Sequence, residues 1–264
     1  MSQQIDRSFG RKAFGADPAN YDRARPSYPD WVFERLARTA GLGPGAAALE
    51  IGAGTGTASR ALLARGADPL VAVEPDARSA EFLRQSDASP ALTVRAEPFE
   101  TANLPAASFD LAASFTAFHW LDEAAALAKI AAALKPGGWW APCWNVFGDD
   151  AYPDAFHEAT TEVLNGPRSP SQGLAGVGFA VDAQRRIAAI DATGGFERAN
   201  YYTSHWPLVL DADETVALYA TYSNIAVRPD RAEVLAELRR IAQVEFGGRV
   251  VRNMTTILYL ARRR

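Results

Sequence analysis

A short apolar run followed by alternate glycines is the feature that most restricts how this chain can fold. Residues Ala46–Ile51 are almost all apolar, and Gly52, Gly54 and Gly56 follow at every second position. The next segment, Thr57–Arg65, carries its apolar residues at helical spacing. The sequence therefore predicts a buried strand, a tight glycine turn and a helix, in that order.

The alternation of strand and helix continues along the chain. Strand-like runs are expected at Leu70–Val73, Leu92–Arg95, Phe109–Ser114 and Trp139–Val146, and helices at Asp76–Gln85 and Asp122–Leu134. Strands that alternate with helices form a parallel sheet with helices on both faces. In such sheets, ligands bind at the carboxyl ends of the strands, near the point where the strand order reverses.

The last part of the chain has a different pattern. Two long alternating runs, Phe196–Leu210 and Arg249–Leu260, are separated by two helical segments, Ala212–Asn224 and Asp230–Phe246. Strands that come so late predict an antiparallel pair at the sheet edge. The expected fold is α/β, with a doubly wound, mostly parallel sheet, an antiparallel edge strand and a helical cover.

Charge and composition exclude several classes of partner. With 27 Lys and Arg against 31 Asp and Glu, the net charge is −4, which argues against a nucleic-acid partner. Cys143 is the only cysteine, so an intramolecular disulfide is impossible. We see no signal peptide and no charge-free run near the roughly 20 residues of a membrane span. We therefore expect a cytoplasmic protein that does not contact membranes. The sequence does not decide whether it forms a homodimer.

The glycine turn differs from the pattern that binds a dinucleotide. That pattern is G-x-G-x-x-G, whereas position 57 is threonine and the acidic Glu50 precedes the turn. Alternate glycines let the backbone pass close beneath a ligand, and Glu50 would repel a pyrophosphate and favour a cation. A sulfonium amino acid fits both demands, and a nicotinamide oxidoreductase is the weaker alternative.

The stretch from Leu49 to Gly56 resembles the first motif of the class I S-adenosylmethionine-dependent methyltransferases. Residues 71–76 are similar to the second strand of that family, which implies that Glu74 accepts hydrogen bonds from both ribose hydroxyls of the cofactor. The resemblance implies a Rossmann-like fold and S-adenosyl-L-methionine as cofactor. The cofactor-binding residues that we expect are Glu50, Gly52, Ala53, Gly54, Gly56, Glu74, Pro75, Ala96, Glu97 and Ser114.

Further segments narrow the resemblance. Residues 109–111, 114–120 and 134–138, and the opening pattern from Tyr21 to Pro29, are similar to small-molecule members such as the trans-aconitate methyltransferases. This implies a single methyltransferase domain over residues 1–264. Its expected parts are an N-terminal helical cover at 1–45, a cofactor-binding core at 46–147, and edge strands with helical insertions at 148–264.

The acceptor side is less defined by the sequence. His119 is the candidate general base, because it follows the fourth strand and imidazole titrates near neutral pH, but packing against the cofactor is the favoured interpretation. Tyr21, Arg25 and Trp120 are the candidate substrate residues. No metal is expected, because Asp149 and Asp150 lack a third ligand at a recognisable spacing.

The function expected from the sequence is methyl transfer to a small-molecule acceptor, with release of S-adenosylhomocysteine. Two alternatives keep the same cofactor site. One is a cofactor-dependent cyclase, and the other is a non-catalytic binding module. We also expect two segments to enclose the acceptor, namely the stretch around Tyr21 to Tyr28 and the helical insertion Ala212–Phe246.

Overall fold

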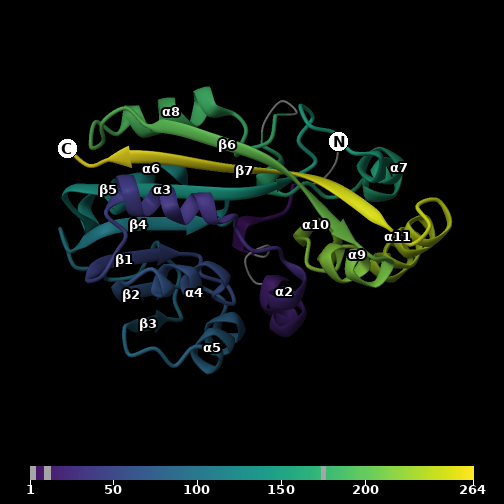
Figure 1. The fold of residues 1–264 in the computed structure, drawn as a ribbon, viewed down its shortest axis with the longest axis horizontal. Coiled ribbons are helices and arrows are strands. Elements are labelled where there is room, and N and C mark those ends of the chain that lie inside the picture. Colours follow the sequence, from purple (N-terminus) through teal and green to yellow (C-terminus); the bar gives the residue numbers. More distant parts are fainter. Residues whose placement is uncertain (1–3, 9–12, 174–176) are drawn as a thin grey trace.

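The computed structural model describes residues 4–8, 13–173 and 177–264. These residues form one sheet of seven strands in the order β3-β2-β1-β4-β5-β7-β6 (Figure 1). The strands are β1 Ala46–Ile51, β2 Ala67–Val73, β3 Leu92–Arg95, β4 Phe109–Phe115, β5 Leu134–Phe147, β6 Asn200–Leu210 and β7 Val250–Arg262. The strand order reverses between β1 and β4, which places a ligand crevice at their carboxyl ends.

Strand direction confirms the predicted fold class. The strands β1–β5 pair in parallel, whereas β7 is antiparallel to both β5 and β6. The sequence predicted an antiparallel pair of strands at the sheet edge. It did not predict their order, in which the last strand, β7, lies between β5 and β6 and β6 forms the edge. Alternating apolar residues identify a strand without identifying its neighbours.

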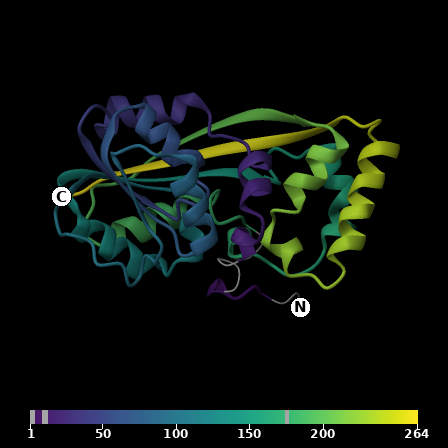
Figure 2. The same cartoon turned by 90° about the horizontal axis from the view of Figure 1, so that it is seen from below.

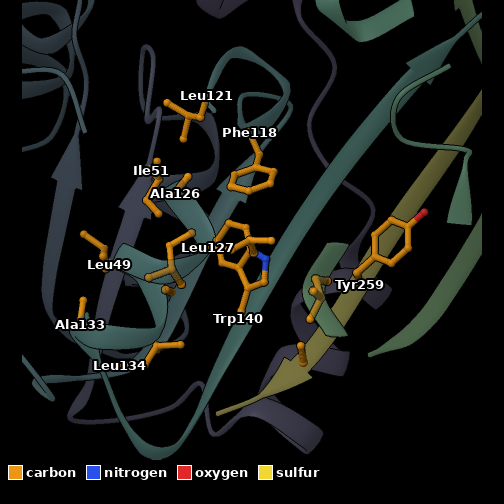
Figure 3. Close-up of a cluster of buried hydrophobic side chains, with 14 of the residues drawn as sticks. Leu49, Ile51, Phe118, Leu121, Ala126, Leu127, Ala133, Leu134, Trp140 and Tyr259 are labelled. Carbon is orange, nitrogen blue, oxygen red and sulfur yellow. The ribbon is translucent and has the colours of Figure 1, made fainter. Parts of the chain in front are cut away.

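Helices cover both faces of the sheet. The helices α3 Asp30–Ala40 and α4 Thr57–Ala64 pack on one face together with Leu70, Leu111 and Cys143. The helix α6 Glu123–Ala133 packs on the other. Figure 3 shows the core beneath α6, where Trp140 lies near Leu127 and Phe118. The remaining helices of this part are α5 Ala77–Ser86 and α8 Ala183–Ala192.

A second group of helices, which we call the helical lobe, lies where β6 ends and β7 begins (Figures 1 and 2). It consists of α7 Ala155–Leu164, α9 Ala212–Tyr219, α10 Ser223–Ala226 and α11 Arg231–Val244. These helices share their own buried cluster, which includes Phe156, Leu218 and Leu238. The lobe corresponds to the helical cover expected from the sequence.

The short helix α2, Pro18–Ala24, lies between the core and the helical lobe in both views (Figures 1 and 2). Asp17 caps its first turn by accepting a hydrogen bond from the Asn20 backbone N–H at 3.0 Å. The sequence did not predict this helix, because it contains no buried residue and therefore shows no apolar face. No helix among the described residues is both long enough and apolar enough to cross a membrane.

Candidate functional site

The glycine turn after β1 passes directly under the loop that follows β4. Gly52 has φ +74°, and a Cβ at this position would lie 2.4 Å from the Cβ of Ala117. Gly54 has φ +57° and faces Tyr21, whose Cε1 would lie 4.0 Å from an added Cβ. A side chain at Gly52 would therefore close the gap between the two loops, and one at Gly54 would force a strained backbone.

The Glu74 carboxylate is fixed by backbone donors at the end of β2. Its Oε2 accepts a hydrogen bond from the Gly54 N–H at 2.8 Å, and its Oε1 accepts one from the Asp76 N–H at 2.8 Å. The residue is 6% exposed and lines the main cavity. A carboxylate has two acceptor oxygens with two lone pairs each, a geometry that suits a vicinal diol.

A cavity of about 310 Å³ extends from the carboxyl ends of the strands into the helical lobe. Its near end is lined by Ile51, Gly52, Gly54, Val73, Glu74, Pro75, Ser79 and Phe99. Its far end is lined by residues that include His157, Leu164, Ser171, Gln172, Tyr219, Tyr222 and Arg252. The cavity thus joins the expected cofactor site to a second chamber in the helical lobe.

Aromatic side chains form the walls between the two ends. Trp120 and Trp144 line the cavity, as do Phe14, Phe147 and Phe179. The rings of Trp144 and Phe179 lie 5.8 Å apart, and those of Phe14 and Trp120 lie 5.6 Å apart. The middle of the cavity is therefore suited to a flat or apolar part of a ligand.

His119 lies in the 3-10 turn Phe118–Trp120 and is 4% exposed. The indole Nε1–H of Trp144 donates a hydrogen bond to its Nδ1 at 3.2 Å. Burial, followed by the charges of Arg25 and Arg7, lowers the His119 pKa to about 3. With Nδ1 accepting, the proton of the neutral ring is on Nε2, so this geometry favours the packing interpretation over that of a general base.

Arg25 joins the N-terminal part of the chain to the helical lobe. Its Nε donates to Thr221 Oγ1 at 2.8 Å, and its Nη2 donates to the Thr221 carbonyl at 3.1 Å. The guanidinium carbon lies 4.8 Å from the ring centre of Tyr222 and 5.1 Å from that of Tyr21. Arg25 and Tyr21, both predicted substrate residues, therefore lie together on the cavity wall.

Glu50 lies in a smaller pocket of about 50 Å³, which Arg25 and Tyr28 also line. Burial is the main cause that raises the pKa of Glu50 to about 8, and the charge of the nearby Glu74 contributes to this rise. The Ser59 hydroxyl donates to Glu50 Oε2 at 2.5 Å and opposes this shift. A buried carboxyl of this kind would gain from a cationic ligand group, which would stabilise its ionised form.

Several residues predicted from the sequence lie elsewhere. The Ser114 hydroxyl donates to the Ile51 carbonyl at 2.8 Å, so it ties β4 to β1. Glu97 forms an ion pair with Arg95 at 2.5 Å, and Ala96 is exposed. Among the described residues that line the main cavity, we do not find Ser114, Ala96, Glu97, Ala53 or Gly56, although Ala53 lines the smaller pocket. Their roles in cofactor binding stay predictions.

The sequence did not single out several residues that line the cavity. Tyr219, Tyr222 and Phe179 come from segments whose apolar spacing is that of ordinary packing, and Arg252 lies in a strand. Thr116 has φ +53°, which is uncommon for a β-branched residue, and its Oγ1 lies 2.7 Å from the Tyr28 hydroxyl. Among the described residues, no group of three or more His, Cys, Asp or Glu side chains could hold a metal ion.

Comparison with known proteins places the glycine turn in a recognised domain. Residues 49–141 match the family model described as "Methyltransferase domain". An uncharacterized methyltransferase of Mycobacterium tuberculosis is 35% identical over 137 residues, which cover 50% of this chain and 52% of the relative. An uncharacterized methyltransferase-like protein of Schizosaccharomyces pombe is 27% identical over 249 residues, which cover 92% of this chain and 89% of the relative.

The chain thus spans about half the length of the mycobacterial relatives that it matches. Among solved structures, the cyclase SpnF has a TM-score of 0.60 at 16% identity, covering 99% of this chain and 98% of that chain. At this identity the likeness concerns the fold alone. The sequence matches are therefore to a methyltransferase domain and to methyltransferase-like proteins, and none of them names the trans-aconitate subtype.

The geometry at Glu74 leads to a first prediction. Glu74→Ala should weaken S-adenosylmethionine binding by about 1.5–3 kcal/mol, the range for hydrogen bonds to a charged group. Isothermal titration calorimetry measures the change. Glu81→Ala, which alters an exposed carboxylate on α5, is the control and should bind like the wild type. Unchanged affinity in Glu74→Ala would refute the assignment of Glu74 to the ribose.

The buried imidazole leads to a second prediction. Because the pKa of His119 is about 3 in the folded state and about 6.5 when unfolded, the unfolded chain binds a proton that the folded chain does not. Above pH 6.5 the neutral ring costs the folded state nothing. As the pH falls below 6.5, protonation of His119 in the unfolded chain lowers the free energy of unfolding, by about 2 kcal/mol at pH 5.

Urea unfolding of the wild type and His119→Gln at pH 7 and pH 5 tests this second prediction. The variant should lose about 2 kcal/mol less stability than the wild type between the two pH values. Parallel pH dependences for the wild type and His119→Gln would show that the ring is protonated in the folded state.

Proposed function

We propose that this chain is an S-adenosylmethionine-dependent methyltransferase that methylates a small-molecule acceptor by in-line transfer and releases S-adenosylhomocysteine. The observation that carries the proposal is the Glu74 carboxylate, which two backbone N–H groups orient at the rim of the cavity. It stands at the carboxyl ends of parallel strands, beside the point where the strand order reverses. The matched methyltransferase domain includes this part of the chain.

The residues at the near end of the cavity fit the cofactor. Glu74 would accept hydrogen bonds from the ribose hydroxyls, and the glycine turn at Gly52 and Gly54 leaves room for the ligand to pass. Glu50 and Arg25 face the same small pocket, where they would bind the ammonium and carboxylate ends of an amino acid. These assignments of single residues are part of the proposal.

When bound, the cofactor supplies a methyl group that is attached to a positively charged sulfur. The nucleophile of the acceptor would attack this methyl group in line and displace the sulfur, which leaves as part of S-adenosylhomocysteine. The contribution of the chain would be to align the acceptor and exclude water, and alignment of this kind lowers barriers by up to ~7–11 kcal/mol. The imidazole of His119 is a weak base with its Nδ1 occupied. We therefore infer an acceptor whose nucleophile needs no strong base, with His119 and Trp120 packing around it.

The N-terminal segment, Phe14–Pro29, supports an enclosed site. On one side, Asp22 forms an ion pair with Arg60 of α4 at 2.6 Å. On the other, the Asn20 side-chain Nδ2 donates to the Ala217 carbonyl of α9 at 3.0 Å. We propose that this segment and the helical insertion Ala212–Phe246 together cover the acceptor, as the parts of a single domain over residues 1–264.

The finer assignments are proposals on the same basis. We place the chain with the small-molecule methyltransferases similar to the trans-aconitate enzymes, acting in the cytoplasm, without a nucleic-acid partner and without a metal. Their support is the sequence resemblance at residues 109–138 and in the opening pattern from Tyr21 to Pro29. The net charge of −4 supports the proposal that the chain has no nucleic-acid partner.

The second candidate is a cyclase or a non-catalytic binding module built on the same cofactor site. Two observations support this second candidate function. The fold is similar to that of the cyclase SpnF over nearly the whole chain, and His119 offers little basicity beside the aromatic walls. A reaction that needs only orientation and exclusion of water would suit such a cavity.

Binding and turnover measurements together test the proposed function. Calorimetry should show binding of S-adenosylmethionine and no binding of NAD. Incubation with a library of small-molecule acceptors should then produce S-adenosylhomocysteine in proportion to the methylated product. Cofactor binding without S-adenosylhomocysteine for any acceptor would favour the second candidate, and binding of NAD instead would contradict the cofactor assignment.

Hydrogen exchange tests the proposed cover. S-adenosylhomocysteine together with an acceptor from that screen should slow amide exchange in both the N-terminal segment and the insertion Ala212–Phe246, because a closed cover shields their hydrogen bonds from opening. The same amides in the presence of NAD are the control and should stay unchanged. Protection that is confined to residues 50–120 would rule out the cover.

A further inference from the structure

Arg252 lies at the end of the cavity that is farthest from the glycine turn. Phe115, at the end of β4, pairs with Cys143, and Cys143 pairs with Leu258 of β7. Arg252 comes six residues before Leu258 in this strand, which is roughly 20 Å at ~3.3 Å per residue. The strand continues past β5 into the helical lobe (Figures 1 and 2). The chamber beyond the strand ends is therefore elongated.

The Arg252 guanidinium is fixed by partners behind the cavity wall. The residue is 1% exposed, and its Nε donates to both carboxylate oxygens of Asp154, at 3.1 and 2.9 Å. Its Nη1 donates to the hydroxyl of Tyr219. Among the described residues, Nη2 has no hydrogen-bond partner. The cavity is therefore lined here by an oriented donor whose charge Asp154 balances.

Tyr222 lines the same cavity, and its hydroxyl is a second donor. Its oxygen is buried and has no hydrogen-bond partner among the described residues. The Tyr222 ring lies 4.9 Å from that of Tyr219, whose hydroxyl is bonded to Arg252. A buried hydroxyl without a partner is unfavourable, and a ligand atom that accepts its proton would remove that cost.

Charge at this end favours an uncharged ligand group. Asp154 neutralises Arg252, and the Arg25 guanidinium packs on the Tyr222 ring and also lines the small pocket beside Glu50, on the cofactor side. An amine would bring donors towards donors. A carboxylate would come close to the Asp154 charge, and the Arg25 cation on the same wall is assigned in the proposed function to the carboxylate of the cofactor. A carbonyl oxygen is neutral and has two lone pairs, one for each donor.

We propose that the acceptor is an elongated, uncharged molecule whose far end carries a carbonyl oxygen, bound by the Tyr222 hydroxyl and by Nη2 of Arg252. The atom that is methylated lies at the opposite end, beside His119 and Trp120. This inference rests on the proposed function, because it assigns the class of acceptor for the same cavity. Tyr222 and Arg252 are specificity-determining residues in this account.

Stability separates a binding role of Tyr222 from a structural one. Tyr222→Phe removes a hydroxyl that has no partner, so its melting temperature should equal or exceed that of the wild type. Tyr219→Phe is the matched control, since it removes a hydroxyl that is bonded to Arg252 and should lower the melting temperature. An equal loss of stability in the two variants would assign Tyr222 a structural role and overturn the proposal.

Binding of matched probes tests the ligand class. Phenyl, naphthyl and biphenyl skeletons, each as the methyl ketone, the carboxylate and the primary amine, are titrated by calorimetry into protein saturated with S-adenosylhomocysteine. We expect the ketone to bind most tightly, and Tyr222→Phe to weaken it about tenfold while leaving S-adenosylhomocysteine affinity unchanged. Tighter binding of a carboxylate or an amine, an unchanged ketone affinity in Tyr222→Phe, or no ketone binding at all would overturn the proposal.

The same titrations distinguish a failure of this inference from a failure of the proposed function. Absence of S-adenosylhomocysteine binding contradicts the methyltransferase assignment, whereas the ketone series can still be titrated into the protein alone. With an acceptor from the turnover screen, Tyr222→Phe should raise KM about tenfold and leave kcat nearly unchanged, because a remote anchor binds ground state and transition state alike. A fall in kcat at constant KM would contradict the anchor.

Discussion

The proposed cofactor half of the site depends on how two neighbouring carboxylates at the end of β2 are held. Glu74 accepts hydrogen bonds from the Gly54 N–H of the glycine turn and from the Asp76 N–H of its own loop. The Gly15 backbone lies close against Asp76, since a Cβ on Gly15 would lie 2.2 Å from the Asp76 Cγ. The turn, the second strand and the N-terminal segment therefore meet at one acidic corner, where the Glu74 carboxylate that we propose for the ribose is oriented before any ligand arrives.

The proposed acceptor half of the site depends instead on β7. This strand pairs with β5 and β6 and reaches from the core into the helical lobe. Its Thr256 hydroxyl donates to Asn145 Oδ1 at 2.7 Å, and the Asn145 Nδ2 donates to the Ser27 carbonyl at 3.2 Å. Six residues from Leu258, the same strand supplies Arg252. One element thus positions both the N-terminal segment and the far wall of the cavity, so the length of the cavity follows from the sheet register.

Sequence reasoning succeeded where local pattern and chemistry agree. The bounds of β1, Ala46–Ile51, were predicted because a nearly unbroken apolar run meets a glycine turn. Glu74 was proposed from the resemblance of residues 71–76 to the second strand of the methyltransferases, and its role in binding the ribose stays a prediction. Ser114 carries no comparable signal, since a hydroxyl at a strand end serves a ligand or, as here, the Ile51 carbonyl. Arg252 was missed because its importance comes from pairing across 98 positions with Asp154, which no local spacing reveals.

The central claim is that Glu74 and the glycine turn bind S-adenosylmethionine so that its methyl faces the aromatic chamber. A crystal structure of the complex with S-adenosylhomocysteine tests it most directly. The account predicts the ribose hydroxyls on the Glu74 carboxylate, with the sulfur beside His119 and the open chamber that leads towards Arg252. A ligand whose ribose lies away from Glu74, or whose sulfur faces solvent outside the cavity, would contradict it.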